Sequence, residues 1–122
     1  MTKKLAFLLM MMAFAVFALL VACDMPEPRK TDAQLGLTPA QAIGRHIFDA
    51  KCGLCHAAYS GREYKGPSLQ GIFKKRYLHT GAPANDDRVR DIVSYGHDKM
   101  PGFSRSLTEQ QIDEVIIYLH TL

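Results

Sequence analysis

Two cysteines and a histidine stand together in the segment Cys52-Gly53-Leu54-Cys55-His56. Thiols three residues apart can form a redox pair or half of a zinc site, but a histidine directly after the second cysteine is typical of c-type haem attachment. Each thiol can add to one haem vinyl group, and the next imidazole then lies under the macrocycle. The pattern predicts that Cys52 and Cys55 attach one haem c and that His56 ligates its iron.

The competing interpretations of this segment lack the surroundings that they need. A thioredoxin-like redox motif belongs near a βαβ unit, and the sequence has no convincing alternating strand pattern. A structural zinc site needs two further Cys or His ligands at suitable spacing, whereas the other histidines are isolated along the chain. Haem therefore remains the favoured cofactor.

The chain offers few candidates for the sixth iron ligand. After the N-terminal apolar run it has two methionines, Met25 and Met100, and Met25 is too close to the N-terminus to reach the haem. Met100 lies 44 residues after His56 in a loop between two expected helices, where Pro101 stiffens the backbone. A thioether raises the reduction potential of the iron. We expect Met100 to be the ligand, with two alternatives: that His97 ligates instead, or that Met100 only fills the core.

Several helices are expected to hold these residues. Capping boxes, Thr38–Gln41 and Thr108–Gln111, mark the start of two of them, and apolar residues follow each at helical spacing. A third should begin after Asn85 or Asp86 and run through Tyr95, and a short one is expected over Ser68–Arg76. The expected inward-facing residues are Ala40, Ile43, Gly44, Ile47 and Phe48, then Val89, Ile92 and Val93, then Ile112, Val115, Ile116, Leu119 and Leu122. The predicted class is all-α, with about four short helices around one haem.

The N-terminus resembles that of a bacterial lipoprotein precursor. Lys3 and Lys4 precede eighteen apolar residues, Leu5–Ala22, and the run ends in the lipobox-like segment Leu20-Val21-Ala22-Cys23. The resemblance implies cleavage before Cys23 and acylation of this residue, with several acyl chains giving a stable anchor. The alternative is an uncleaved signal anchor, because eighteen residues can just span a bilayer.

The chain is thus expected to have three parts. Residues 1–22 form a lipoprotein signal peptide, residues 23–37 an acylated cysteine with a flexible tether, and residues 38–122 the haem-binding domain. The tether segment holds two prolines, five charged residues and little apolar content, although it could instead pack on the domain as an arm. The domain would then be exported and anchored on the periplasmic side, and Asp24 favours the inner membrane.

Size and charge exclude several classes of protein. A chain of 122 residues allows one domain and excludes a large enzyme or a repeat array. The net charge of +3 falls to +1 when Lys3 and Lys4 leave with the signal peptide, which is too low for a nucleic-acid-binding protein. Nothing in the sequence requires more than a monomer.

Residues 38–122 resemble a small bacterial class I cytochrome c. The resemblance depends on Cys52–His56, on Gly66–Leu69 with Gly71-Ile72, on Met100-Pro101 and on the aromatic-bearing last helix. It implies that the carbonyl group of Pro67 accepts a hydrogen bond from the proximal imidazole.

Two further features of that family can be assigned to residues here. In the family the first and last helices cross at a glycine and two aromatic residues, which correspond to Gly44, Phe48 and Tyr118. The family also has an aromatic residue near the haem propionates, often tryptophan, and this chain has no tryptophan. The candidates to replace it are Tyr64, Tyr77 and Tyr95.

The function implied by these features is transfer of single electrons, not catalysis. Partners would be other redox proteins that dock transiently at the haem edge. Basic residues could form a docking ring or simply a solvated face; they are Lys51, Lys65, Lys74, Lys75, Arg76 and Lys99. The alternatives are a fixed haem subunit of a larger oxidoreductase and a five-coordinate haem sensor or peroxidase.

Overall fold

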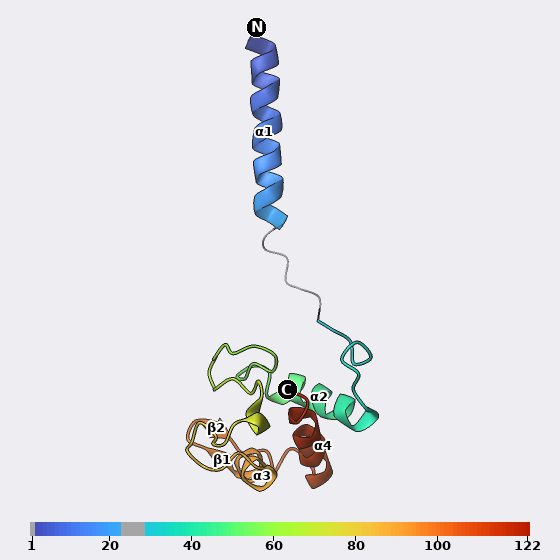
Figure 1. Cartoon of the computed structure of the whole chain (residues 1–122), viewed down its shortest axis with the longest axis vertical. Helices are drawn as coiled ribbons and strands as arrows, with labels where there is room; N and C mark the ends of the chain where they lie inside the picture. Colours follow the sequence, from blue (N-terminus) through green and yellow to red (C-terminus); the bar gives the residue numbers. More distant parts are fainter. Residues whose placement is uncertain (1, 23–28) are drawn as a thin grey trace. The chain divides into compact units, whose positions relative to one another are not determined.

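The described residues of the N-terminal unit contain one helix. The computed structural model describes residues 2–22 and 29–122, which divide into the units Met1–Thr31 and Asp32–Leu122. Helix α1 (Thr2–Ala22) includes the whole apolar run Leu5–Ala22 (Figure 1). No helix within these described ranges combines the length and hydropathy that crossing a bilayer requires. The expected acylation site Cys23, together with Asp24 and Met25, lies outside the described residues.

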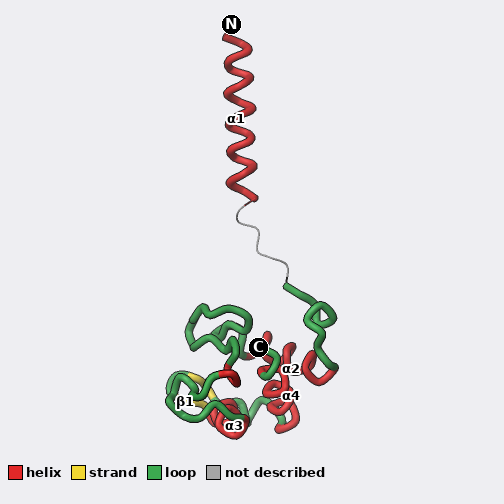
Figure 2. Tube along the Cα trace, viewed as in Figure 1, coloured by secondary structure: helices red, strands yellow, loops and turns green. Residues whose placement is uncertain are grey.

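The second unit is built from helices and long loops (Figure 2). Its elements are α2 (Pro39–Lys51), a 3-10 turn η1 (Ile72–Lys74), α3 (Asp86–Tyr95), the strands β1 (Gly96–His97) and β2 (Met100–Pro101), and α4 (Glu109–Leu119). The sheet in this unit is one antiparallel hairpin of two-residue strands. The predicted all-α class is confirmed.

The helix starts follow from local hydrogen bonding. Thr38 caps α2: its hydroxyl accepts from the backbone N–H of Gln41, whose side chain accepts from the backbone N–H of Thr38. Thr108 and Gln111 make the same reciprocal pair at α4. Asn85 caps α3. Each cap satisfies backbone donors that a helix leaves unpaired at its N-terminus, which is why these boundaries were predictable.

The core lies where α2 crosses α4. A Cβ built on Gly44 would overlap the carbonyl oxygen of Glu114 and lie 2.9 Å from the Cβ of Tyr118, so the two backbones meet at this glycine. The rings of Phe48 and Tyr118 pack beside it with centroids 5.4 Å apart, and both residues are fully buried. Val115 is buried next to them. The crossing expected from the family resemblance is confirmed.

Three local expectations are wrong. Ile43, placed on the inner face of α2, is 47% exposed, and Arg45 is buried at 8% because it pairs with a carboxylate from outside the helix. The helix expected over Ser68–Arg76 shrinks to the three residues of η1, which begins after Gly71 in a left-handed conformation (φ +62°). The hairpin of β1 and β2 was not expected.

The segment before α2 joins the domain earlier than the sequence suggested. Asp32–Leu37 form a turn closed by the Leu37 N–H donating to the Asp32 carbonyl oxygen at 3.0 Å. The Asp32 carboxylate lies 2.6 Å from the Arg45 guanidinium, and Leu37 packs on the core. This part of the expected tether therefore behaves as the packed arm that was its alternative.

Candidate functional site

The cysteine pair lies where α2 ends. Cys52 caps the helix, and its carbonyl oxygen accepts from the N–H groups of Cys55 at 3.0 Å and His56 at 2.9 Å. This tight turn places both thiols and the imidazole within one short stretch of backbone. Both thiols are free; Cys52 is buried and Cys55 is half-buried. Burial, and to a lesser extent Cys55, raises the pKa of the Cys52 thiol to about 11.

The imidazole of His56 is held by the loop that follows. Its Nδ1 lies 2.8 Å from the carbonyl oxygen of Pro67. A carbonyl can only accept, so Nδ1 carries the proton and Nε2 keeps the lone pair that a metal would take. The ring also lies against Gly66, where a Cβ would come within 2.5 Å of the His56 Cε1. Two free thiols beside an imidazole with a fixed tautomer fit a covalently bound haem.

Met100 belongs to a different part of the domain. It lies on β2 opposite His97, and Gly96 pairs with Pro101. The side chain of Met100 is half-buried and packs against the core cluster that also contains Cys52. The N–H of Phe103 donates to the α3 carbonyl of Val93 at 2.9 Å, which fixes the loop after the hairpin onto that helix. The two-residue hairpin thus presents one thioether to the interior.

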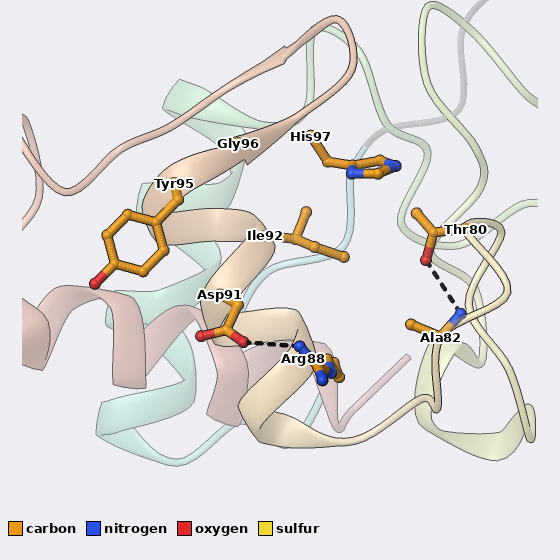
Figure 3. A pocket seen from close by; sticks show the side chains of 8 residues that line it. All are labelled: Thr80, Ala82, Arg88, Asp91, Ile92, Tyr95, Gly96 and His97. Carbon is orange, nitrogen blue, oxygen red and sulfur yellow. Dashed lines mark hydrogen bonds and ion pairs between the residues drawn. The ribbon is translucent and has the colours of Figure 1, made fainter.

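His97, the alternative ligand, lines an open surface pocket instead (Figure 3). The pocket encloses about 550 Å³ between α3 and the loop around Thr80. Ile92 lies at its centre, and Arg88 lies at its edge, paired with Asp91 at 3.3 Å. His97 is exposed there, whereas Met100 is half-buried. No group of three or more metal-ligating His, Cys, Asp or Glu side chains occurs among the residues that the structure describes.

Sequence analysis did not predict a contact between two tyrosines, Tyr59 and Tyr118, close to the Cys52–His56 segment. The hydroxyl of Tyr118, fully buried, donates to the hydroxyl of Tyr59 at 2.8 Å. Burial, followed by this hydrogen bond, raises the pKa of Tyr118 far above its usual value. Tyr59 lies three residues after His56, so the contact ties the loop to α4. Tyr118 was expected at the helix crossing, but its separation of 59 residues from Tyr59 gives no local signal of the pair.

Two of the isolated histidines, His46 and His120, have partners that the sequence did not indicate. The Nε2 atom of His120 lies 2.8 Å from Asp86, and its ring stacks on Phe73 with centroids 3.9 Å apart. His46 lies 3.1 Å from Asp32. These contacts join separate elements at the surface and are structural.

Known proteins similar to this chain are c-type cytochromes. Residues 39–119 match the family described as "Cytochrome C oxidase, cbb3-type, subunit III". Cytochrome c6 of Rippkaea orientalis is 29% identical over 111 residues, which cover 91% of this chain and 89% of that protein. A cytochrome c-553-like protein of Synechocystis is 32% identical over 79 residues, 65% of this chain and 66% of that protein.

A solved structure agrees with the sequence relatives. Cytochrome c6 from the diatom Phaeodactylum tricornutum superposes with a TM-score of 0.53 at 28% identity, covering 66% of this chain and 90% of that one. The relatives are electron-transfer proteins with one covalently bound haem c and its iron, and they are not enzymes. The chain belongs to the cytochrome c family and is a class I c-type cytochrome with a single haem, related to the cytochromes c6.

Proposed function

We propose that this protein is an exported, membrane-anchored carrier of single electrons in which Cys52 and Cys55 attach the haem and His56 and Met100 ligate its iron. The observation that carries the proposal is the 2.8 Å contact between the Nδ1 of His56 and the Pro67 carbonyl oxygen. It leaves Nε2 as the ligating atom and increases the basicity of the imidazole.

The residues of the chain define what the iron can do. When bound, the haem supplies an iron that alternates between ferric and ferrous states. His56, whose ring is oriented by the Pro67 carbonyl, would donate electron density to that iron. Met100 would favour the ferrous state and, as a ligand, would keep small molecules from the iron. With both positions filled, the site would pass electrons through the haem edge and break no substrate bond.

Anchoring is proposed from the N-terminal sequence. The lipobox-like segment ending at Cys23 supports cleavage and acylation, which would hold the domain at the periplasmic face of a membrane, with the inner membrane favoured by Asp24. Incorporation of labelled palmitate tests this, with Cys23→Ser as the matched variant. Label in the native chain and none in the variant is the expected result. No label in either would contradict a lipid anchor.

Partner docking is proposed at the basic residues of segment 51–76, which begins with the last residue of α2. Segment 51–76 holds six basic side chains and one acidic one, Glu63, whereas α3 and α4 together contribute six of the chain's twelve acidic residues. Such an uneven distribution steers an acidic partner and makes association faster at low salt. Lys74 contributes less than its neighbours, because its Nζ donates to the Leu122 carbonyl oxygen at 2.9 Å. We expect the protein to act as a monomer, and we expect no nucleic acid among its partners.

One finding favours a second candidate, a fixed haem subunit of an oxidase. The matching family is named for such a subunit. Against this, the chain covers 89% of a cytochrome c6 that is a protein in its own right. Solubilisation of the membranes in mild detergent separates the two: a mobile carrier elutes as a small species, and a subunit elutes with a large haem-containing assembly.

Optical spectra of the haem-loaded protein test the ligands. We expect a thioether-to-ferric charge-transfer band in the oxidised protein and no response of the reduced protein to carbon monoxide. Met100→Ala should lose the band and open the iron to carbon monoxide, while His97→Ala should keep both properties of the native protein. The reverse pattern would make His97 the ligand. An open iron in the native protein would instead favour a sensor or peroxidase.

A further inference from the structure

We infer that Ser68 is a positioning residue for the His56 imidazole and that it acts through the carbonyl group of Pro67. The inference rests on the proposed function, because it takes His56 as an iron ligand. The Pro67 carbonyl is the group that fixes the tautomer and direction of the His56 ring. What holds this carbonyl in place therefore also determines how the imidazole faces the iron.

Regular secondary structure does not provide the support. Between α2 and η1 the chain runs through residues 52–71 as turns and irregular loop. Pro67 has no N–H group and cannot anchor itself through its own nitrogen. Its carbonyl group, however, lies in one rigid plane with the nitrogen and Cα of Ser68. Fixing Ser68 consequently fixes the direction of the Pro67 oxygen.

The side chain of Ser68 is anchored on two sides. Its hydroxyl donates to the carbonyl oxygen of Ser60 at 2.6 Å and accepts from the backbone N–H of Gln70 at 3.2 Å. The first bond joins two residues that are eight positions apart, and so it holds the second half of this loop against the first half. The second closes a local turn around Ser68 itself. One hydroxyl thus supplies both a distant and a local restraint.

Neighbouring contacts close the loop on either side of this hydroxyl. The N–H of Gly66 donates to the Cys55 carbonyl oxygen at 2.9 Å, and the N–H of Leu69 donates to that of Ala57 at 2.9 Å. The Gln70 side chain donates to the Tyr59 carbonyl oxygen at 3.2 Å. Among these contacts, the Ser68 hydroxyl is the side-chain restraint nearest in sequence to the Pro67 carbonyl.

The consequence is electronic. A well-placed carbonyl acceptor makes the imidazole a stronger donor, and a stronger donor stabilises ferric iron. Loss of the Ser68 hydroxyl lets the Pro67 carbonyl move away from Nδ1, weakens that donation and shifts the equilibrium toward the ferrous form. The midpoint potential should rise.

The test compares Ser68→Ala with Ser68→Thr in the full-length, haem-loaded protein. We expect Ser68→Ala to shift the ferric–ferrous equilibrium constant by about three- to tenfold toward ferrous, or about 28–59 mV for one electron. The NMR signal of the His56 Nδ1 proton should exchange faster with water in the same variant. Ser68→Thr keeps a hydroxyl at this position and should restore both values.

Thr121→Ala is the matched control. It removes another hydroxyl that donates to a backbone carbonyl oxygen, that of Tyr118 at 2.7 Å, at the far end of α4. It should lower stability without changing the potential or the proton exchange. If Ser68→Ala does not fold, Gln70→Ala removes a second restraint on the same loop and should raise the potential by a smaller amount.

The inference is overturned if Ser68→Ala, or Gln70→Ala in its place, loses stability as the control does while the potential and the exchange of the Nδ1 proton stay native. Failure of the proposed function would look different. It would appear in the native protein, as absence of a haem attached to Cys52 and Cys55 or absence of a His56 ligand signal.

Discussion

The backbone of Gly44 in α2 lies directly against the carbonyl group of Glu114 in α4, with no room for a side chain between them. The Cβ of Tyr118 would also lie only 2.9 Å from a Cβ at this position. Because Cys52 directly follows α2, this contact fixes the start of the Cys52–His56 segment against the last helix. The glycine is therefore required by the approach of two backbones, not by its conformational freedom.

We predict that Gly44→Ala destabilises the haem-loaded protein by about 1–3 kcal/mol. Alanine is the better helix former by about 1 kcal/mol, but the new methyl group must push the two helices apart, and overpacking of this kind costs more. The midpoint of denaturant unfolding measures the effect. Ala50→Ser, on the exposed side of the same helix, should stay within about 0.5 kcal/mol of the native protein. An unchanged midpoint in Gly44→Ala would mean that the crossing is looser than described.

Gly66→Ala should displace the His56 imidazole rather than disrupt the fold. The added methyl group would lie 2.5 Å from Cε1 and 2.9 Å from Nδ1 of His56, so the ring must turn away from the Pro67 carbonyl or the loop must open. We expect a shifted potential and a weakened ligand field in the absorption spectrum. Gly61→Ala is the control in the same loop, since a Cβ there would meet only the Gln70 side chain at 3.9 Å. Native spectra in both variants would contradict the packing of His56 on Gly66.

Tyr59 and Tyr118 differ in burial, and this difference predicts which of the two substitutions to phenylalanine destabilises the protein more. Tyr59→Phe leaves the buried hydroxyl of Tyr118 without its partner, whereas Tyr118→Phe leaves the hydroxyl of Tyr59 on a residue that is 49% exposed and can bind water. Leaving a buried group unsatisfied costs about 1–3 kcal/mol, and losing an average hydrogen bond about 0.5–1.5 kcal/mol. Tyr59→Phe should therefore lower the free energy of unfolding more than Tyr118→Phe does.

A double-mutant cycle on this pair supplies the check. The loss in Tyr59→Phe/Tyr118→Phe should be smaller than the sum of the single losses, because the double variant has no unsatisfied hydroxyl. Strict additivity, or a larger loss in Tyr118→Phe, would show that the 2.8 Å contact does not persist in solution.

Sequence reasoning succeeded where the signal is local. The capping boxes at Thr38 and Thr108 each lie within four residues, and the Cys52–His56 motif lies within five, so their geometry depends on little else. The contact of His56 with Pro67 was reached through the family resemblance, because no local rule connects residues eleven positions apart.

Sequence reasoning failed where packing between distant segments decides. Arg45 falls on the buried side of α2 because Asp32, thirteen residues earlier, neutralises it there, and helical periodicity alone cannot detect such a partner. His120 looked isolated, but folding brings Phe73 and Asp86 to it. The short helix expected over Ser68–Arg76 is reduced to η1, because the Ser68 hydroxyl binds the distant Ser60 carbonyl oxygen and Gly71 adopts a left-handed conformation.

Asp32 is predicted to hold the N-terminal arm on the domain. Its carboxylate lies 2.6 Å from the buried guanidinium of Arg45. Burial disfavours the charge of Arg45, but the hydrogen bond to Asp32 and nearby negative charges outweigh it and raise the pKa of Arg45. Asp32→Ala should cost about 1–3 kcal/mol, because it removes a charged partner from a buried group. Limited proteolysis should then cut within residues 32–37.

His46→Ala is the control for this arm. His46 contacts the same carboxylate at 3.1 Å, but its side chain is 72% exposed. Exposed ion pairs contribute little, so its loss should change stability by less than about 1 kcal/mol and leave the arm protected. Equal protease sensitivity in both variants would show that burial of Arg45 does not hold the arm.

Stability should fall at alkaline pH through Tyr118. In the unfolded chain a tyrosine loses its proton near pH 10, whereas burial and the hydrogen bond to Tyr59 hold the pKa of Tyr118 well above that value in the folded protein. Above pH 10 the unfolded state therefore binds fewer protons than the folded state. The free energy of unfolding then decreases as pH rises, by up to about 1.4 kcal/mol per pH unit.

Tyr118→Phe isolates this contribution, because the other ionisable groups remain in the variant. At pH 8 the variant should be the less stable protein, since it lacks the hydrogen bond to Tyr59. Between pH 10 and 12 the native protein should lose stability faster, and the two unfolding midpoints should converge. Parallel curves over that range would mean that the hydroxyl of Tyr118 ionises as readily in the folded protein as in the unfolded chain, which its complete burial does not permit.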